Sequence, residues 1–139
     1  MVLVDTTVWI DFFAGRDTDQ VAALGRRLDG REDICVCGVV LTEVLQGIRE
    51  DRDYRRTKES FANLLFLPMG RESFVNAAEL YRSLRKQGVT IRKPVDCMIA
   101  AVAIEHTVPL LHNDRDFEAI AAYSELKVID TSQEDSHSE

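Results

Sequence analysis

A short apolar run that ends in an acid constrains the fold more than any other feature of the sequence. Residues 2–4, Val-Leu-Val, have the character of a buried strand, and Asp5 follows them directly. In an open parallel α/β sheet the ligand crevice lies outside the carboxyl ends of the strands, so Asp5 is predicted to stand at its floor. The alternative is that Asp5 or Thr6 only caps a helix predicted over residues 7–14.

Length and composition indicate a single globular domain. A chain of 139 residues is close to the usual size of one domain, which we place at residues 1–130. Residues 131–139 are polar and are predicted to be a disordered tail. No apolar run approaches the roughly 20 residues of a membrane span or has the form of a signal peptide. We therefore expect a cytoplasmic protein without membrane contact, in which an odd count of three cysteines forms no disulfide framework.

The net charge of −7 is unevenly distributed. Residues 49–93 contain 11 basic and 6 acidic side chains, a net charge of +5, which leaves 6 basic and 18 acidic side chains, or −12, elsewhere. A basic block of this kind is either a solvated helical surface or a contact surface for a phosphate backbone. Charge alone leaves both interpretations open.

Apolar segments of strand and helix character alternate along the chain, which predicts an α/β fold with right-handed crossovers. Its central parallel sheet should have four or five strands. The predicted strands cover residues 2–4, 34–37, 66–69 (an edge strand, because of Pro68), 108–111 and 126–129.

Four acids occupy positions that face one edge of such a sheet. Asp5 and Asp114 follow strands, Glu43 lies early in a helix predicted over residues 39–48, and Asp96 lies in the first turn of an apolar central helix. The structural alternative is capping for Asp5, capping or a favourable interaction with the helix dipole for Glu43, and the dipole interaction for Asp96. A carboxylate in a buried helix needs more than a dipole, however, to offset its lost hydration.

Carboxylates that converge without a cation repel one another and take up protons. All-oxygen acidic ligands suit Mg²⁺ or Mn²⁺, and no Cys or His cluster offers a site for a softer metal. A metal-bound water is a stronger nucleophile, and the cation neutralises charge that develops on a phosphate. Hydrolysis of phosphodiester bonds is the reaction that these residues favour.

Four motifs, in order along the chain, carry a resemblance to a known family. They are Val4-Asp5-Thr6-Thr7, Leu41-Thr42-Glu43-Val44-Leu45 with Gly47, Asp96-Cys97-Met98-Ile99-Ala100-Ala101, and Asn113-Asp114-Arg115-Asp116-Phe117. Over residues 1–130 the chain resembles the PIN-domain ribonucleases, and in particular the VapC-like toxins of toxin–antitoxin pairs. Each motif is weak alone, but four in order are specific.

The resemblance implies a three-layer α/β/α domain that cuts RNA with Mg²⁺ or Mn²⁺. It also implies a cognate antitoxin, a homodimer and a larger toxin–antitoxin assembly. Carried over by position, the catalytic acids are Asp5, Glu43, Asp96 and Asp114, of which the first, third and fourth are metal ligands. The same carry-over makes Thr6 and Asp116 supporting residues. His112 stands where many relatives have Thr or Ser, and it receives no assigned role.

Three basic residues near the acids are candidates for contact with RNA. Arg92, four residues before Asp96, is predicted to contact a phosphate, assisted by Lys93 and Arg115. The structural alternative for Arg92 is a surface salt bridge of little energetic weight.

Two other functions fit the same acids. A metal-dependent phosphatase or phospho-acceptor domain also places acids near its first strand, but it calls for a second acid at position 7, which is Thr7 here. A noncatalytic PIN-like domain would bind RNA or a protein partner without cutting. The presence of all four acids favours the nuclease over both.

Overall fold

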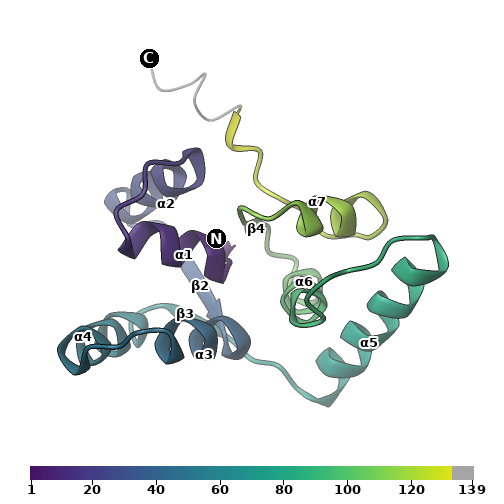
Figure 1. Cartoon of the computed structure of the whole chain (residues 1–139), viewed down its shortest axis with the longest axis horizontal. Helices are drawn as coiled ribbons and strands as arrows, with labels where there is room; N and C mark the ends of the chain where they lie inside the picture. Colours follow the sequence, from purple (N-terminus) through teal and green to yellow (C-terminus); the bar gives the residue numbers. More distant parts are fainter. Residues whose placement is uncertain (133–139) are drawn as a thin grey trace.

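The structure, a computed structural model, describes residues 1–132 (Figure 1). Its strands are β1 (Val2–Val4), β2 (Ile34–Cys37), β3 (Leu65–Leu67) and β4 (Leu110–Leu111). Its helices are α1 (Thr6–Phe13), α2 (Asp19–Asp29), α3 (Gly38–Gln46), α4 (Asp51–Phe61), α5 (Arg71–Lys86), α6 (Val95–Glu105) and α7 (Arg115–Ala122). The strands form one sheet in the order β3-β2-β1-β4, and every neighbouring pair is parallel.

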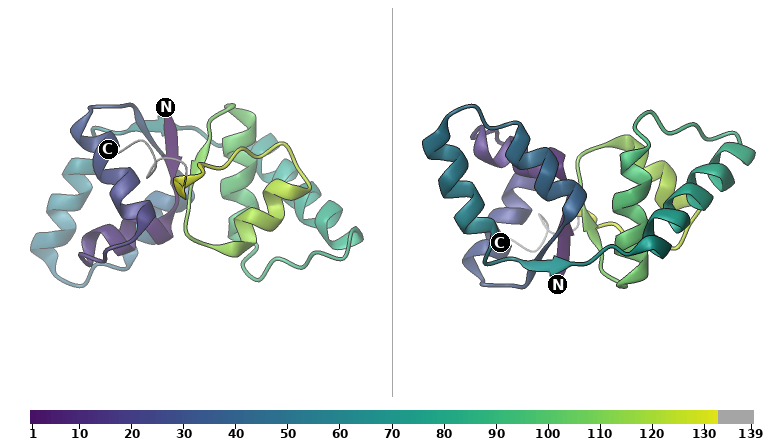
Figure 2. Two further views of the ribbon diagram at one scale, coloured as in Figure 1. Left: turned by 90° about the horizontal axis from the view of Figure 1, so that it is seen from above. Right: turned by 90° about the horizontal axis from the view of Figure 1, so that it is seen from below.

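The sheet lies between two groups of helices, as the resemblance predicted. Figure 2 shows α1–α4 on one side of the strands and α5–α7 on the other. The two central strands, β1 and β2, are buried along their whole length. This arrangement confirms the three-layer α/β/α fold with a four-stranded parallel sheet.

The predicted last strand is reduced to a single β-bridge between Leu110 and Val128. Leu110 donates its N–H to the carbonyl of Lys127 and accepts from the N–H of Ile129, both at 2.9 Å. Because β4 has only two residues before the chain turns toward α7, a longer strand at 126–129 has no partner to pair with. The prediction of a full strand there was wrong.

Local sequence explains where the helices begin and end. The Asp5 side chain accepts the N–H of Thr7 and is the N-cap of α1, and Thr18 caps α2 in the same way. Helix α6 is apolar on nearly all sides, and it packs against α3, α5 and α7. Helix α4 ends at Phe61, and the apolar residues that follow form β3.

The core is continuous from the sheet into α6 and α7. Cys35, Cys37 and Cys97 are buried free thiols within it, as expected. Thr131, the first residue of the predicted tail, is 9% exposed and accepts a hydrogen bond from Gln20 at 3.5 Å. The prediction for residues 133–139 lies outside the described part of the chain. Within residues 1–132, no helix is both long and apolar enough to cross a membrane.

Candidate active site

The carboxyl ends of β1 and β4 bring two acids to one edge of the sheet. Asp5 follows β1 and Asp114 follows β4, and the backbone N–H of Asp5 donates to the carbonyl of Leu111 at 2.9 Å. Val4 pairs with Leu111 in the parallel register, so Asp5 comes level with His112, and Asp114 lies two residues further along at the same edge. Glu43 on α3 and Asp96 at the start of α6 approach the same edge.

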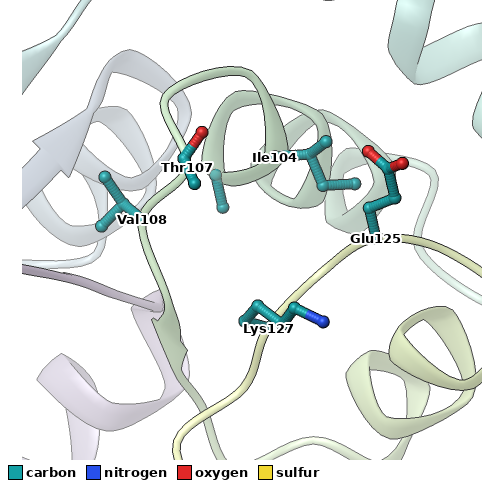
Figure 3. Close-up of a pocket in the computed structure, with 6 residues that line it drawn as sticks. Ile104, Thr107, Val108, Glu125 and Lys127 are labelled. Atoms are coloured by element: carbon teal, nitrogen blue, oxygen red, sulfur yellow. The ribbon is translucent and has the colours of Figure 1, made fainter.

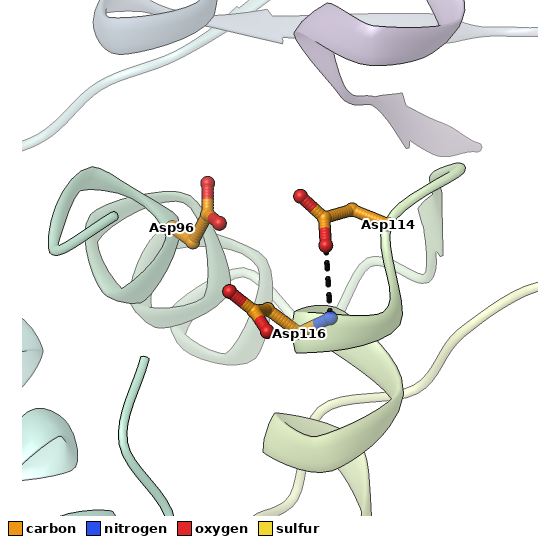
Figure 4. A group of neighbouring side chains, drawn as sticks. All are labelled: Asp96, Asp114 and Asp116. Atoms are coloured by element: carbon orange, nitrogen blue, oxygen red, sulfur yellow. Dashed lines mark hydrogen bonds between the residues drawn. The ribbon is translucent and has the colours of Figure 1, made fainter. Parts of the chain in front are cut away.

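Three aspartates form the tightest acidic group in residues 1–132. Asp96, Asp114 and Asp116 each offer a carboxylate oxygen, and these oxygens lie within 4.8 Å of one another. Figure 4 shows the three side chains turned toward a common point from α6, from the end of β4 and from the first turn of α7. One cation of ordinary size can contact all three. We refer to these three residues as the aspartate cluster.

Asp96 is the most buried member of the aspartate cluster, at 3% exposed. Its Oδ2 atom has no hydrogen-bond partner among residues 1–132. Burial, together with the charges of Asp5, Asp114 and Asp116, outweighs the attraction of Lys93 and raises the pKa of Asp96 to about 7. A carboxylate that is buried, unpaired and reluctant to ionise is a strong candidate for a cation ligand.

Asp114 differs from Asp96 because several hydrogen-bond donors stabilise its ionised form. Its Oδ1 accepts the N–H of Asp116 at 2.9 Å and the Arg92 guanidinium at 3.2 Å, and its Oδ2 lies 3.4 Å from Lys93 Nζ. Partial burial favours a higher pKa, but the Asp116 N–H and the two cations outweigh it, so the pKa of Asp114 lies below its usual value. Asp114 is therefore ionised and well oriented.

The other half of the site pairs its acids with hydroxyl groups. Thr7 donates to Asp5 Oδ2 from Oγ1 at 2.6 Å and from its backbone N–H at 3.1 Å. Thr6 Oγ1 donates to Glu43 Oε1 at 2.8 Å, so Thr6 orients a predicted catalytic acid directly. Burial raises the pKa of Asp5 despite the bonds from Thr7. Asp5 therefore caps α1, as the structural alternative predicted, and it is also a buried carboxylate at the end of β1.

A hydrogen bond joins the two halves. The backbone N–H of Asn113 donates to Thr7 Oγ1 at 3.3 Å, across an interval of 106 residues. The charge of Asp5 also contributes to the raised pKa of Asp96, which places both acids in one electrostatic environment. Glu43 in turn adds to the effect of burial in raising the pKa of Asp5, so the four predicted acids share this electrostatic environment. Asp5 and Glu43, however, lie outside the aspartate cluster, and Asp116 lies inside it.

The basic residues meet the acids rather than standing free. Arg92 contacts Asp116 through Nε at 3.2 Å and Asp114 through Nη2 at 3.2 Å, and its pKa is raised mainly by the bond to Asp116. This pairing is the surface salt bridge predicted as the alternative role of Arg92. The Arg92 side chain is nevertheless 67% exposed, so it can contact a phosphate as well. Arg115 is exposed on the rim of a neighbouring hollow.

His112 is buried, at 7% exposed, which does not suit direct contact with a substrate. Its ring lies 5.2 Å from that of Phe117, and its Nε2 atom lies 3.1 Å from Glu118 Oε1. Burial outweighs the attraction of Glu118 and lowers the pKa of His112. Sequence reasoning missed the contact with Glu118, although a spacing of six residues across a strand end and a first helical turn could have suggested it.

A second hollow lies at the opposite end of β4 and has different chemistry. Figure 3 shows Ile104, Thr107, Val108, Glu125 and Lys127 around it, at the end of α6 and the start of the strand. Glu125 is its single acid, and Lys127 belongs to the same lining. This hollow offers no group of converging carboxylates, and it does not compete with the crevice as a candidate active site.

The donor set of the crevice fits a divalent metal ion. The unpaired Asp96 Oδ2 is an acceptor without a donor, and the aspartate cluster provides two further carboxylates within reach of one ion. Hard oxygen ligands of this kind bind Mg²⁺, Mn²⁺ or Ca²⁺. A parallel α/β/α sheet with an acidic cluster at its carboxyl edge defines a class of α/β domain whose ligand crevice lies outside the strand ends.

Comparison with known proteins identifies the family within this class. The sequence profile of the PIN domain matches residues 2–123, and the chain belongs to the PIN-domain family. Ribonuclease VapC11 of Mycobacterium tuberculosis is 35% identical over 131 residues, covering 91% of this chain and 96% of that protein. These findings confirm the family that the four sequence motifs predicted.

Solved structures show the same fold at lower identity. The structure of FitAcB from Neisseria gonorrhoeae superposes with a TM-score of 0.73 at 21% identity, covering 95% of this chain and 99% of the other. A toxin–antitoxin complex from Klebsiella pneumoniae gives a TM-score of 0.70 at 19% identity, covering 94% and 98%. At such identities the likeness carries the fold alone.

Proposed function

We propose that this protein is a metal-dependent endoribonuclease and the toxin of a toxin–antitoxin pair. Membership of the PIN-domain family and 35% identity to a protein named as a VapC ribonuclease support this function. The structural observation that carries it is the aspartate cluster, with the buried and unpartnered Oδ2 of Asp96 at its centre. The proposed metal is Mg²⁺, with Mn²⁺ as the alternative.

The acids divide into holders of the metal and residues that orient them. Asp96 and Asp114 are the proposed ligands in the aspartate cluster, and Asp116 supports them from the same group. Asp5 completes the ligand set from the end of β1, and Glu43, oriented by Thr6, accepts a proton or orients a water from α3. A bound Mg²⁺ or Mn²⁺ supplies a water of lowered pKa and neutralises charge on the phosphate.

The basic residues complete the site on the substrate side. Arg92 and Lys93 already lie against the aspartate cluster, where they offset part of its charge. A guanidinium that is two-thirds exposed beside the proposed metal position is suited to contact the scissile phosphate. Arg115, on the rim of the hollow next to Asp114, is the proposed third contact with the RNA backbone.

Exposed apolar side chains support protein partners. Ile10, Phe13 and Tyr54 are exposed on α1 and α4, at 49%, 49% and 37%. A second group, at 40–55% exposed, lies on β3 and α5 and consists of Leu65, Phe66, Phe74 and Val75. Two such groups on a chain of this size indicate interaction surfaces. They support pairing with a cognate antitoxin, with a second copy of the chain, and with a larger assembly of both.

The decisive experiment is cleavage of a pool of structured RNAs by the purified, antitoxin-free protein. Reactions contain Mg²⁺, Mn²⁺ or EDTA, and compare the native chain with Asp96→Asn and Asp5→Asn. Asp29→Asn is the matched control, because Asp29 is exposed at the end of α2 and belongs to no part of the crevice. We expect discrete, metal-dependent cuts by the native chain and the control, and none by the two site variants.

Three results would contradict the proposal. Cleavage that persists in EDTA, or in both site variants, would show that the cuts come from another source. Absence of cuts by the metal-loaded native chain, combined with unchanged RNA binding in Asp5→Asn, would favour the noncatalytic alternative. Release of phosphate from a small phosphate ester, without RNA cleavage, would favour the phosphatase.

A further inference from the structure

A relay of local hydrogen bonds leads from His112 into the aspartate cluster. The backbone N–H of Asp114 donates to His112 Nδ1 at 3.1 Å, and the backbone N–H of Asp116 donates to Asp114 Oδ1 at 2.9 Å. Each bond joins a side chain to the amide two residues later, which is the pattern of an Asx turn. The two turns share Asp114: its N–H closes the first turn and its side chain forms the second. The first turn therefore fixes the backbone from which the Asp114 side chain extends.

The relay requires one particular tautomer of the His112 ring. An Nδ1 atom that accepts an N–H cannot carry a proton, so the ring proton lies on Nε2. Nε2 in turn lies 3.1 Å from Glu118 Oε1, an acceptor that matches this proton. Phe117 packs against the ring at a centroid distance of 5.2 Å and limits its rotation. Glu118 and Phe117 both belong to α7, the helix that Asp114 caps.

We propose that His112 is a positioning residue for metal binding, which acts by holding the Asp114 amide and thereby the Asp114 carboxylate. The inference rests on the proposed function, because it takes Asp114 as a metal ligand. Glu118 has a part in it as the group that selects the Nε2–H tautomer. His112 itself contacts neither metal nor RNA, in agreement with its burial.

The position of Asp114 explains why such support matters. Arg92 Nη2 lies 3.2 Å from Asp114 Oδ1 and Lys93 Nζ lies 3.4 Å from its Oδ2, and a metal ion would have to compete with both cations. A carboxylate on a mobile loop would follow the two cations. With its own amide held by His112 and its Oδ1 held by the Asp116 N–H, Asp114 stays directed at the cluster. Partners that orient ligands in this way commonly contribute 10- to 100-fold in metal affinity.

A matched pair of substitutions separates this role from simple packing. His112→Phe keeps an aromatic ring against Phe117 but removes the Nδ1 acceptor. His112→Asn gives up most of the ring but supplies a carbonyl oxygen that can accept the Asp114 N–H as an ordinary Asx turn. If His112 matters only as a core residue, Phe is the milder change. If it positions Asp114, Asn is the milder change.

The measurement is Mn²⁺ affinity by calorimetry, with the melting temperature of each metal-free variant as the check on folding. We expect His112→Phe to bind Mn²⁺ about tenfold more weakly than the native chain, and His112→Asn to stay close to it. A native affinity in His112→Phe, or equal weakening in both variants, would overturn the inference. Asp114→Asn is the reference. If it binds Mn²⁺ like the native chain, the proposed metal site fails, and the positioning role fails with it.

The tautomer can be observed without metal or activity. Nitrogen NMR of the ¹⁵N-labelled chain in EDTA distinguishes the protonated from the unprotonated ring nitrogen of each of the three histidines. We expect His112 to carry its proton on Nε2, and Glu118→Ala to weaken that preference. A proton on Nδ1 in the native chain would overturn the inference even if the nuclease is confirmed.

Discussion

The two halves of the acidic crevice hold their charges in different ways. At the ends of β1 and in α3, Asp5 and Glu43 are bonded to the hydroxyls of Thr7 and Thr6. On the side of α6 and α7, the aspartate cluster is partly balanced by the cations Arg92 and Lys93, while the Oδ2 atom of Asp96 is left unpaired. Neutral hydroxyl groups stabilise the acids of the first half, whereas cations partly neutralise the acids of the second.

This difference indicates which half should bind a metal ion more strongly. Hydroxyl donors orient a carboxylate without cancelling its charge, and they satisfy acceptors that would otherwise be buried and unpaired. Ion pairs orient and neutralise together, but the Arg92 and Lys93 side chains are 67% and 50% exposed, so solvent screens their pairing with Asp114. The uncompensated atom lies in the second half. A metal ion should therefore be centred on the aspartate cluster, with Asp5 and Glu43 at its margin.

The largest effect should come from removing the charge at the unpaired atom. We expect Asp96→Asn to weaken Mn²⁺ binding by at least about a hundredfold, because a direct ligand should exceed the contribution of its supporting partners. Asp5→Asn should weaken binding clearly less, while abolishing cleavage. Calorimetry with Mn²⁺ on both variants tests the ranking. A greater loss of Mn²⁺ affinity in Asp5→Asn than in Asp96→Asn would place the ion nearer to Asp5 and Glu43 and would contradict this ranking.

The pH dependence of stability should come from the same side chain together with Asp5, whose pKa burial also raises. The pKa of Asp96 is about 7 in the folded protein and near 3.8 in the unfolded chain. Between these values the folded state holds a proton that unfolding releases, so the free energy of unfolding of the metal-free protein should fall as pH rises through this window. It should level off above it.

Melting temperatures in EDTA at pH 5 and pH 8 measure this effect. We expect the native chain and Asp29→Asn to melt lower at pH 8, and Asp96→Asn to lose much of the difference and to be more stable than the native chain at pH 8. Asp29 is an exposed acid outside the crevice and serves as the matched control. If the melting temperature of Asp96→Asn differed between pH 5 and pH 8 as much as that of the native chain, another group would be responsible for the pH dependence.

Removing a cation should shift metal and RNA binding in opposite directions. Arg92→Ala takes a positive charge from the aspartate cluster, so Mn²⁺ should bind a few-fold more tightly. The same change removes a proposed phosphate contact, so RNA should bind more weakly, and the slope of log affinity against log salt should fall by about one. Lys127→Ala is the control, because Lys127 is exposed beside the opposite end of β4. Changes of the same sign in both affinities would contradict the dual role.

The smallest effect should come from the hydroxyl-bonded half. Thr6→Val keeps the shape of the side chain and removes the 2.8 Å hydrogen bond to Glu43. We expect a loss of about 1 kcal/mol in unfolding free energy and a several-fold lower cleavage rate, with Mn²⁺ affinity nearly unchanged. Urea denaturation and initial cleavage rates measure these effects, and Thr6→Ser should restore both. A large loss of Mn²⁺ affinity in Thr6→Val would show that the two halves are not separable.

The sequence by itself determined the class of fold and the edge at which the acids gather. Strand and helix segments alternate clearly enough to be predicted from local sequence; Asp5 directly follows β1, and Asp114 lies three residues after the end of β4. Parallel pairing then brings strand ends together, so the convergence followed from topology alone. The predicted strand at 126–129 failed because pairing depends on the length of its neighbour, β4, which no local pattern reveals.

Only the tertiary structure decided how the acids divide. Asp116 joins Asp96 and Asp114 because the first turn of α7 directs it back toward α6. Arg92 lies near Asp96 in sequence, yet it pairs with Asp114 and Asp116 across more than 20 residues. Distances between side chains on different elements depend on how those elements pack, and a linear pattern does not encode packing. The local sequence placed each acid at the crevice, and the packing of α6 against α7 selected three of them.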